Sequence, residues 1–250
     1  MGKGAGCGGS TEKIPTPSPE AMSGKPVLNY FSICGRGEVA RLICAAGELE
    51  FEDKAYAPAF DETGGWRQGY KPIGEQYGFP GVLPVLEHGE LKLFQTSAIE
   101  SYLAAISPKF SGLTPAQKAK DEMFQLIKSD INGNTESLLF KKITAEDLTP
   151  IMDKWYPTIE GLLPASGFIN GLAFPTPGDL AVMVVAMGCM PFRAAPQMAG
   201  CGPTAEKYPK MMALAAAAAA YPAVAAFLAK SEHKTLKADP FGIMPAEYKD

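Results

Sequence analysis

Residues 81–104, GVLPVLEHGELKLFQTSAIESYLA, contain three structural signals in succession. The first half is predicted to form two short strands around a turn at His88-Gly89, a pattern typical of a β-hairpin. The second half places apolar side chains at helical spacing behind a polar start, Gln95-Thr96-Ser97, which is typical of a capped helix. This stretch therefore predicts strand, turn, strand and helix.

The residues before this stretch continue the mixed pattern. Residues 26–31 (PVLNYF) alternate and are rich in strand formers, so they predict a first strand. Residues 37–49 (GEVARLICAAGEL) have apolar side chains at helical spacing and predict a helix that ends near Gly47. Residues 51–57 predict a second strand, followed by an irregular loop over 58–81. The predicted order is β-α-β-loop-β-β-α, a mixed α/β unit.

The residues after this stretch show no strand signal. Residues 107–115 (SPKFSGLTP) contain Pro and Gly and are typical of a linker. Helical patterns then cover about 115–131, 145–163, 177–190, 204–220 and 222–230, and the alanine run 215–220 is predicted to be a packed helix. We predict an α/β domain over 26–106, a linker over 107–114 and an all-α domain over 115–250. The Gly/Pro/Ser-rich residues 1–25 predict a disordered tail.

Composition and charge argue against several classes of protein. The hydrophobic fraction of 46% and charged fraction of 20% are typical of a globular protein. The net charge is −4 and no basic run follows the spacing of phosphates, so no nucleic-acid partner is expected. The longest apolar stretch, 211–229, is mostly alanine and is interrupted by Tyr221-Pro222, so no membrane span is expected.

The five cysteines are odd in number and widely spread, without CxxC or Cys/His ligand spacing. This pattern predicts reduced thiols in a reducing compartment, the cytoplasm, rather than a disulfide framework or a zinc site. With only His88 and His233, the chain has few imidazoles from which to build a metal site or a catalytic triad.

Four motifs together resemble the cytosolic glutathione transferases, and most closely their tyrosine-type sigma class. The motifs are LNYF…GRGEVARL (28–42), the opening stretch 81–104, TPGDLAV (176–182) and KYPKMMAL…YPAVAAFLA (207–229). The resemblance runs from about Pro26 to Pro240. It implies a thioredoxin-like N-terminal domain joined to an all-helical domain, usually in a homodimer.

Three neighbouring residues are candidates for the group that stabilises or supplies the reactive thiolate: Tyr30, Ser32 and Cys34. A thiolate is the reactive form of glutathione, so the protein must stabilise that anion. Tyr30 occupies the position of the tyrosine that donates a hydrogen bond to sulfur in the tyrosine-type classes. Serine-type and cysteine-type members use the start of the following helix, where the helix dipole favours an anion. Cysteine-type members usually have Cys-Pro there, whereas Gly35 follows Cys34 here, so Tyr30 is the preferred candidate.

Arg36 matches an arginine that several tyrosine-type classes place near the sulfur. A fixed cation there would favour both the thiolate and a polarised phenol. The alternative is a surface salt bridge between Arg36 and Glu38. Arg41, three residues after Glu38, is an equally good partner for that carboxylate on one helix face. Cys34 is also predicted to be exposed enough for glutathionylation.

The resemblance implies two further contacts with glutathione. Leu83-Pro84 resembles the family's cis-proline turn, in which the residue before proline offers its N–H and C=O to the cysteinyl unit. Gln95 and Thr96 occupy the positions of a pair that binds the γ-glutamyl carboxylate at a helix N-terminus, where the dipole favours an anion. Simple N-capping by Thr96 is the alternative and is compatible with that role.

The match to the family is weaker elsewhere in the binding site. Trp66 and Lys71 resemble the residues that hold the glycine carboxylate, but their spacing is one residue longer than usual, and Arg67 is an alternative cation. Val82 replaces a glutamine that is frequent in the sigma class. These differences slightly favour a relative without catalysis.

The helical half contains residues for which we expect structural roles. Thr176 and Asp179 have the spacing of a capping box, so Asp179 is expected to act in folding. The residues 119–130 include acidic side chains but also lysines, so no metal is expected. Five Met and aromatic residues are expected to be core rather than to line an electrophile pocket: Met123, Phe124, Met183, Met187 and Phe192.

The sequence therefore predicts a glutathione S-transferase that acts on hydrophobic electrophiles, as in detoxification, with peroxidase or isomerase side activities. Glutathione is the co-substrate, and no cofactor is expected. One alternative is a non-catalytic structural or binding module with the same fold. The other is a thiol transferase that depends on Cys34.

Overall fold

The computed structural model describes residues 23–56, 71–139, 142–188 and 191–231. Residues 1–22 of the predicted tail, Trp66 and Arg67 lie outside the described residues. The first part of the chain forms a four-stranded sheet with the order β2-β1-β3-β4. The strands are β1 (Val27–Phe31), β2 (Glu52–Tyr56), β3 (Val85–His88) and β4 (Leu91–Phe94).

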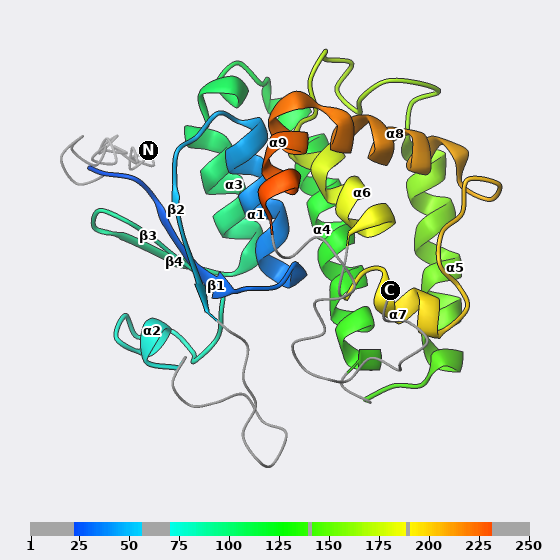
Figure 1. Cartoon of the computed structure of the whole chain (residues 1–250), viewed down its shortest axis with the longest axis horizontal. Helices are drawn as coiled ribbons and strands as arrows, with labels where there is room; N and C mark the ends of the chain where they lie inside the picture. The colour runs from blue at the N-terminus through cyan, green and yellow to red at the C-terminus, as the bar shows by residue number, and fades with distance from the viewer. Residues whose placement is uncertain (1–22, 57–70, 140–141, 189–190, 232–250) are drawn as a thin grey trace, which may run out of the picture.

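The sheet mixes parallel and antiparallel pairs. β1 runs parallel to β2, while β3 runs antiparallel to both β1 and β4. A parallel pair needs a crossover, and α1 (Glu38–Ala46) provides it between β1 and β2. The helices α1 and α3 (Thr96–Ile106) lie between the sheet and the helices that follow α3 (Figure 1). The short helix α2 (Lys71–Glu75) was not predicted within the loop 58–81.

After α3 the described residues form helices only. These are α4 (Pro115–Leu139), α5 (Ala145–Leu162), α6 (Pro177–Met187), α7 (Ala194–Met198), α8 (Pro209–Ala220) and α9 (Pro222–Lys230). Two short 3-10 turns, η2 (Gly35–Gly37) and η4 (Pro108–Phe110), complete the description. The predicted fold class, a thioredoxin-like α/β unit followed by helices, is confirmed.

Three helix predictions differ from the structure. α4 continues eight residues past its predicted end at 131, although Gly133 and Asn134 disfavour a helix. Burial of Leu138 and Leu139 favours this continuation, because it places apolar side chains in the core. α7 was not predicted, and α8 begins at Pro209 rather than at 204 because proline suits the first helical position.

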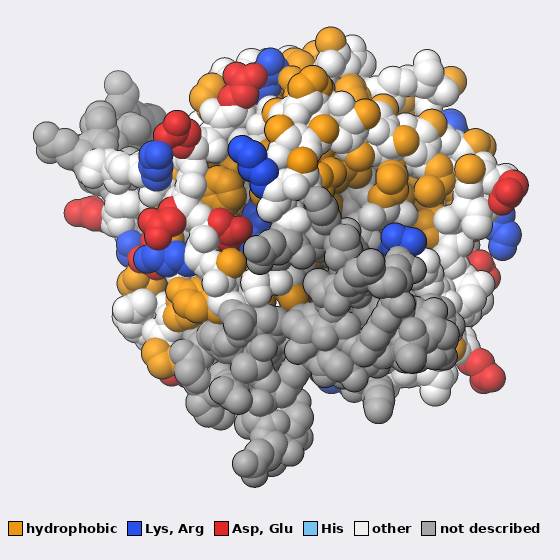
Figure 2. All heavy atoms as spheres, viewed as in Figure 1, with side chains coloured by type: hydrophobic (Ala, Val, Ile, Leu, Met, Phe, Trp, Pro, Cys, Tyr) orange, Lys and Arg blue, Asp and Glu red, His pale blue; other side chains and the backbone are white. Residues whose placement is uncertain are grey.

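The core of the helical half is built around α6, which is buried from Pro177 to Val185 and packs on α4, α8 and α1. The alanine run forms part of α8, with Ala215 and Ala218 buried, so the predicted packed helix is confirmed. Hydrophobic side chains also gather on the surface over α8 and α9 (Figure 2). Within the described ranges no single helix is long and apolar enough to cross a membrane; only α8 and α9 pass that test as a pair, bent by 77°.

The start of α6 is held by two buried carboxylates. Asp179 accepts a 2.8 Å hydrogen bond from the Thr176 main-chain N–H, which confirms the predicted capping box. Asp121, on α4, accepts from the Thr176 hydroxyl at 2.6 Å and from the Gly178 N–H at 3.0 Å. One acidic residue of the 119–130 segment therefore serves the packing of α4 on α6.

We expect the pH dependence of stability to change in Asp121→Asn. Burial and the neighbouring charge of Asp179 raise the pKa of Asp121 from 3.8 to about 6. Because the folded-state pKa is the higher one, the stabilisation from this group is complete below about pH 4 and is lost as the pH rises through about 6. The complete loss corresponds to about 3 kcal/mol. The variant lacks this titration.

Urea unfolding of both proteins at about pH 4.5 and about pH 7.5 measures this effect. Over that interval, the free energy of unfolding should fall by about 2 kcal/mol more in the wild type than in Asp121→Asn. The comparison cancels the titration of groups that do not interact with Asp121. Parallel pH curves for the two proteins would contradict the role given to Asp121.

Candidate functional site

The register of the sheet brings three segments that contain predicted site residues to the same end of neighbouring strands, which form one edge of the sheet. Val85 of β3 pairs with Asn29 of β1 and with Phe94 of β4. The next residues along these strands are Tyr30 in β1, Pro84 before β3 and Gln95 after β4, so all three lie at the same end of neighbouring strands. Leu83 also packs against the small apolar cluster that contains Tyr30.

Tyr30 lies near the end of β1 and is 4% exposed. Its ring packs under the turn η2, in which two of three residues are glycine. A Cβ on Gly35 would lie 2.5 Å from the Tyr30 hydroxyl oxygen, and one on Gly37 would lie 2.4 Å from ring atom Cδ1. Gly35 also has a φ of +41°, a conformation that favours glycine. Glycine at positions 35 and 37 is therefore required for Tyr30 to fit.

The Tyr30 hydroxyl accepts a 2.8 Å hydrogen bond from the main-chain N–H of Arg36. Within the described part of the chain, its own O–H proton has no acceptor. Burial raises the pKa of Tyr30, and the charge of Glu136 adds to that increase, while Arg36 and Arg41 oppose it. The phenol therefore stays protonated at neutral pH and can donate its proton to an anion held beside it.

Arg36 lies in the turn η2, against which the Tyr30 ring packs, and its side chain points toward α4. The guanidinium Nη2 lies 2.5 Å from Oε2 of Glu136 on α4, and both side chains are partly exposed. The alternative salt bridge between Arg36 and Glu38 is wrong, because Glu38 is buried and lies 3.4 Å from Arg41. The other predicted pair, in which Arg41 binds Glu38, is thus confirmed.

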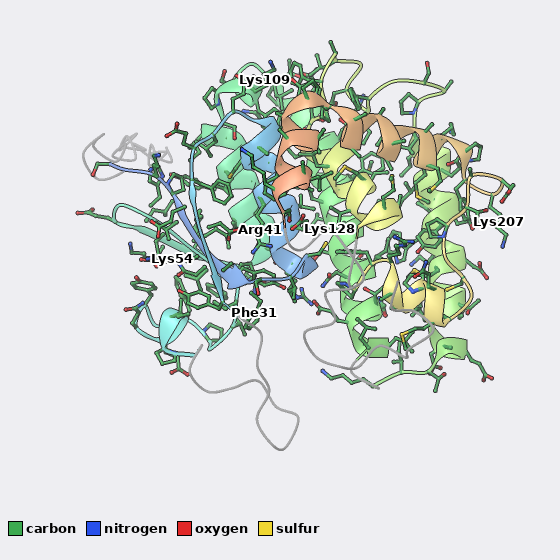
Figure 3. The ribbon with its side chains drawn as sticks, viewed as in Figure 1. Phe31, Arg41, Lys54, Lys109, Lys128 and Lys207 are labelled. Atoms are coloured by element: carbon green, nitrogen blue, oxygen red, sulfur yellow. The ribbon has the colours of Figure 1, made fainter. Side chains whose placement is uncertain are left out.

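Arg41 is fully buried and holds the segment that follows β1. Its guanidinium donates to the carbonyl oxygens of Phe31 at 2.9 Å and Ile33 at 2.8 Å, and to Asp53 at 2.8 Å. Arg41 is part of α1 and is labelled in Figure 3. From the sequence, Arg41 was expected only to pair with Glu38. Its position among apolar helix residues was a signal that it is buried.

The other two candidates of the first motif are less suited to the chemistry. Cys34 is 2% exposed and belongs to the main hydrophobic core, so its predicted exposure is wrong. Cys34 is the N-cap residue of the turn η2, and its side chain packs in that core. Ser32 is partly buried, and its main-chain N–H donates to the carbonyl of Tyr56 at 2.8 Å.

The predicted cis-proline turn is present. The Leu83-Pro84 peptide bond is cis, as predicted. Pro84 is buried and Leu83 is partly exposed. Among the described residues, the Leu83 N–H and C=O have no hydrogen-bond partner. An extended peptide laid along this edge would find both groups available.

The start of α3 also presents polar groups at this edge. Gln95 is exposed and has a φ of 76°, an unusual value for a residue other than glycine. Thr96 is 8% exposed and is the first residue of α3, so the predicted N-cap bond from its side chain is wrong: Gln95 holds the cap position. Across the described ranges, the Thr96 hydroxyl has no partner. The first N–H groups of a helix also lack intrahelical partners, which suits a carboxylate.

The remaining predicted contacts stay predictions. Trp66 and Arg67 lie outside the described residues, and Lys71 is the first residue of α2, without a described side chain. Val82 is 47% exposed beside the cis turn. Of the five Met and aromatic residues expected in the core, three are buried and two are exposed: Phe124, Met183 and Phe192 against Met123 and Met187.

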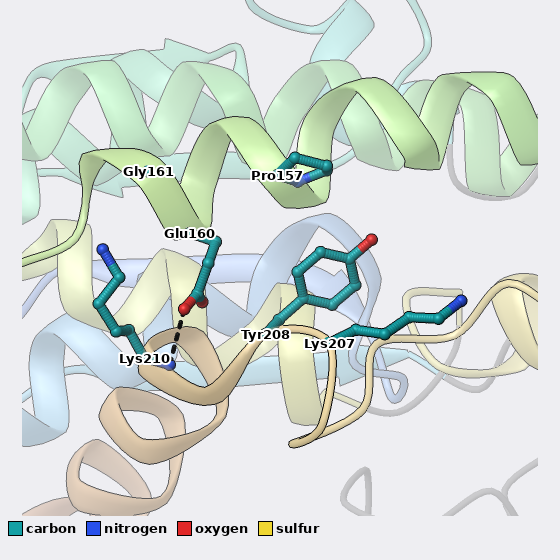
Figure 4. A pocket seen from close by; sticks show the side chains of 6 residues that line it. All are labelled: Pro157, Glu160, Gly161, Lys207, Tyr208 and Lys210. Atoms are coloured by element: carbon teal, nitrogen blue, oxygen red, sulfur yellow. Dashed lines mark hydrogen bonds between the residues drawn. The ribbon is translucent and has the colours of Figure 1, made fainter.

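A cavity of about 590 Å³ lies in the helical half, between α5 and the start of α8 (Figure 4). It is lined by Pro157, Glu160, Gly161, Lys207, Tyr208 and Lys210. Glu160 accepts from the Lys210 and Met211 N–H groups at 3.0 and 2.9 Å, so its carboxylate caps α8. None of these residues belongs to the edge that contains Tyr30.

Gly37→Ala is expected to lower the free energy of unfolding by about 1 to 3 kcal/mol, because the added Cβ overlaps a buried ring. Urea unfolding measures the loss. Gly133→Ala in α4 is the matched control, since a Cβ there meets nothing within 4 Å. Equal stability of Gly37→Ala and the wild type would contradict the packing described for Tyr30.

Comparison with known proteins places this site in a known fold. Residues 26–105 match the model of the glutathione S-transferase N-terminal domain family. A glutathione S-transferase of Tyrophagus putrescentiae is 34% identical over 119 residues, which are 47% of this chain and 51% of that protein. Glutathione S-transferase A3 of Mus musculus is 37% identical over 84 residues, covering 34% of this chain and 35% of the relative. The chain thus spans about half or less of the length of these curated relatives.

The similarity in structure extends further than the similarity in sequence. A Caenorhabditis elegans glutathione S-transferase superposes with a TM-score of 0.64 at 23% identity, over 83% of this chain and 98% of that one. Residues 26–105 thus resemble the N-terminal domain of glutathione S-transferases, and the described chain has the glutathione S-transferase fold.

Proposed function

We propose that this protein is a glutathione S-transferase of the tyrosine type, most similar to the sigma class, and that Tyr30 stabilises the thiolate of glutathione. The observation that supports it most is the state of the Tyr30 hydroxyl. This hydroxyl accepts the Arg36 N–H and keeps its own proton for another acceptor. It does so at the strand edge shared with Leu83 and Gln95.

The chemistry follows from these groups. An ordinary cysteine thiol has a pKa of about 8.5, so free glutathione is mostly a thiol at neutral pH. A hydrogen bond from the Tyr30 O–H favours the thiolate, and the released proton goes to solvent. The sulfur then forms a bond to an electrophilic carbon, and the electron pair of the broken bond leaves with the displaced group. Tyr30 keeps its proton throughout.

The other groups would hold the tripeptide in place. Leu83 would pair its N–H and C=O with the cysteinyl unit, while Gln95 and Thr96 would bind the γ-glutamyl carboxylate at the start of α3. Trp66 and Lys71 would contact the glycine carboxylate. Glutathione is the co-substrate in this scheme, a hydrophobic electrophile is the second substrate, and no resident cofactor takes part.

The same proposal includes a homodimer in a reducing compartment, the cytoplasm. The described cysteines, Cys34, Cys44 and Cys201, are not in disulfides, which supports a reducing environment. Peroxide reduction or isomerisation would use the same thiolate. The exposed Met123 and Leu126 on α4 offer apolar surface for a partner subunit.

Burial distinguishes the proposed function from a Cys34-dependent thiol transferase. A nucleophilic cysteine must meet its disulfide substrate, and Cys34 is 2% exposed. A non-catalytic module remains the second alternative, since Val82 replaces a frequent glutamine. The available Tyr30 proton favours catalysis over that alternative.

Two assays on three proteins test this proposal. Conjugation of glutathione to an aryl halide and reduction of hydroxyethyl disulfide are measured for the wild type, Tyr30→Phe and Cys34→Ala. We expect conjugation to fall in Tyr30→Phe alone. Disulfide reduction lost in Cys34→Ala, with Tyr30→Phe unaffected, would favour the thiol transferase. Binding to immobilised glutathione without activity in either assay would favour the non-catalytic module.

A further inference from the structure

We propose that Glu136, on α4, is a positioning residue for this site: it anchors the Arg36 side chain, and its negative charge offsets the charge that this arginine exerts on Tyr30. This inference rests on the proposed function of Tyr30. Glu136 lies 100 positions after Arg36 in the sequence and in the helical half of the molecule. The site would therefore depend on a carboxylate from outside the glutathione-binding domain.

Glu136 is held in one orientation by contacts to both of its carboxylate oxygens. Oε1 accepts from Asn132 Nδ2 at 2.7 Å, and Oε2 accepts from Arg36 Nη2 at 2.5 Å. Asn132 is one turn earlier on α4 and 2% exposed, so it has little freedom to move. The hydrogen bond from Asn132 therefore orients the Glu136 carboxylate on α4 independently of Arg36.

Arg36 connects this carboxylate to Tyr30 through its two ends. Its main-chain N–H donates to the Tyr30 hydroxyl at 2.8 Å, while its guanidinium bonds to Glu136. The flanking residues Gly35 and Gly37 have no side chains with which to hold the turn. The Arg36 side chain is therefore the side-chain anchor of η2, and Glu136 is its attachment point on α4.

In the part of the chain that the structure describes, the charges around Tyr30 come from three elements. Arg36 belongs to η2, Arg41 to α1 and Glu136 to α4. Arg41 is already paired with Glu38 and Asp53, so its charge is largely compensated. Glu136 compensates Arg36 in the same way and adds to the increase in the pKa of Tyr30. Removing the charge of Glu136 would leave Arg36 as an uncompensated cation, which favours a thiolate.

The pH dependence of conjugation tests the electrostatic part. In Glu136→Gln, the acidic limb of the kcat/KM profile for conjugation of an aryl halide should move to lower pH by about 0.5 to 1 unit. Below the midpoint, this shift corresponds to an increase in rate of about three- to tenfold. Glu122→Gln, an exposed glutamate on the same helix, is the matched control and should leave the profile unchanged. A profile of Glu136→Gln that coincides with the wild type, or moves to higher pH, would overturn the proposal.

Amide hydrogen exchange tests the positioning part without glutathione. In Glu136→Ala, the Arg36 amide should exchange about tenfold faster than in the wild type, because the turn loses its anchor. Glu122→Ala should leave that amide unaffected, and unchanged exchange in Glu136→Ala would refute the anchoring role.

A wild type that does not conjugate glutathione would refute the proposed function alone. The exchange rate of the Arg36 amide in Glu136→Ala, which needs no glutathione, then decides the anchoring role of Glu136. An exchange rate equal to that of the wild type would overturn that role.

Discussion

Replacing Lys128 with methionine is expected to lower the free energy of unfolding by about 3 to 5 kcal/mol. The Lys128 Nζ contacts Oε1 of Glu100, and both side chains are almost completely buried. Gln125 donates to the other oxygen of Glu100 at 2.9 Å. Without Lys128, the carboxylate would remain buried with Gln125 as its one described partner. Burial already raises the pKa of Glu100, and Lys128 opposes that increase.

This pair joins α3, which opens with Thr96, to α4, which provides Glu136 (Figure 3). Lys128→Met combined with Glu100→Leu should regain most of the lost stability, since neither change then leaves a buried charge alone. Urea unfolding of both single variants and the double variant gives the coupling energy. Lys118→Met, at an exposed position of α4, is the control and should change stability by less than about 0.5 kcal/mol. If the losses of stability in Lys128→Met and Glu100→Leu simply add in the double variant, the two residues are not a coupled pair.

Tyr30→Phe is expected to reduce kcat/KM for glutathione conjugation by about 100-fold, the effect of removing one hydrogen-bond donor from a developing or stabilised anion. The phenyl ring fills the same space under Gly35 and Gly37, so the fold should be preserved. Glutathione binding should change little, because under the proposed function Leu83 and Thr96 would hold other parts of the tripeptide. The measurement is steady-state conjugation at neutral pH together with calorimetric binding of glutathione.

Tyr56→Phe provides the matched control for Tyr30→Phe. Tyr56 ends the neighbouring strand β2, and its hydroxyl already donates to Asn29 at 2.8 Å. That hydroxyl has no proton left for a thiolate, so its removal should leave kcat/KM within about twofold of the wild type. A loss in Tyr56→Phe equal to that in Tyr30→Phe would contradict the assignment of the active hydroxyl.

Local sequence patterns were sufficient to predict a mixed α/β unit followed by helices, and the family resemblance implied that the unit is thioredoxin-like. The alternation in β1, the hairpin of β3 and β4, and the apolar spacing of α1 and α3 are all set by neighbouring residues. The differences arose where distant contacts decide the outcome. The last turns of α4 form despite Gly133 and Asn134 because Leu138 and Leu139 are buried by other parts of the chain. Short helices such as α7 have too few residues to show a period.

The candidate site also combines features set by local motifs with features set by distant contacts. The positions of Tyr30, Leu83-Pro84 and Thr96 along the chain were predicted from motifs, and the sheet register brings their segments to one edge. The side-chain direction of Arg36 was not predicted, because its partner Glu136 is 100 residues away. The burial of Cys34 likewise depends on the surrounding core, which a single motif does not contain.

The ultraviolet absorbance of the thiolate of bound glutathione, followed as a function of pH, tests the role of Tyr30 most directly. With the wild type we expect the thiol of bound glutathione to ionise at least one pH unit below its ordinary value of about 8.5. With Tyr30→Phe, the ionisation should return to that ordinary value, while Cys34→Ala should behave as the wild type. Equal ionisation in the wild type and Tyr30→Phe would show that the Tyr30 hydroxyl does not stabilise the thiolate.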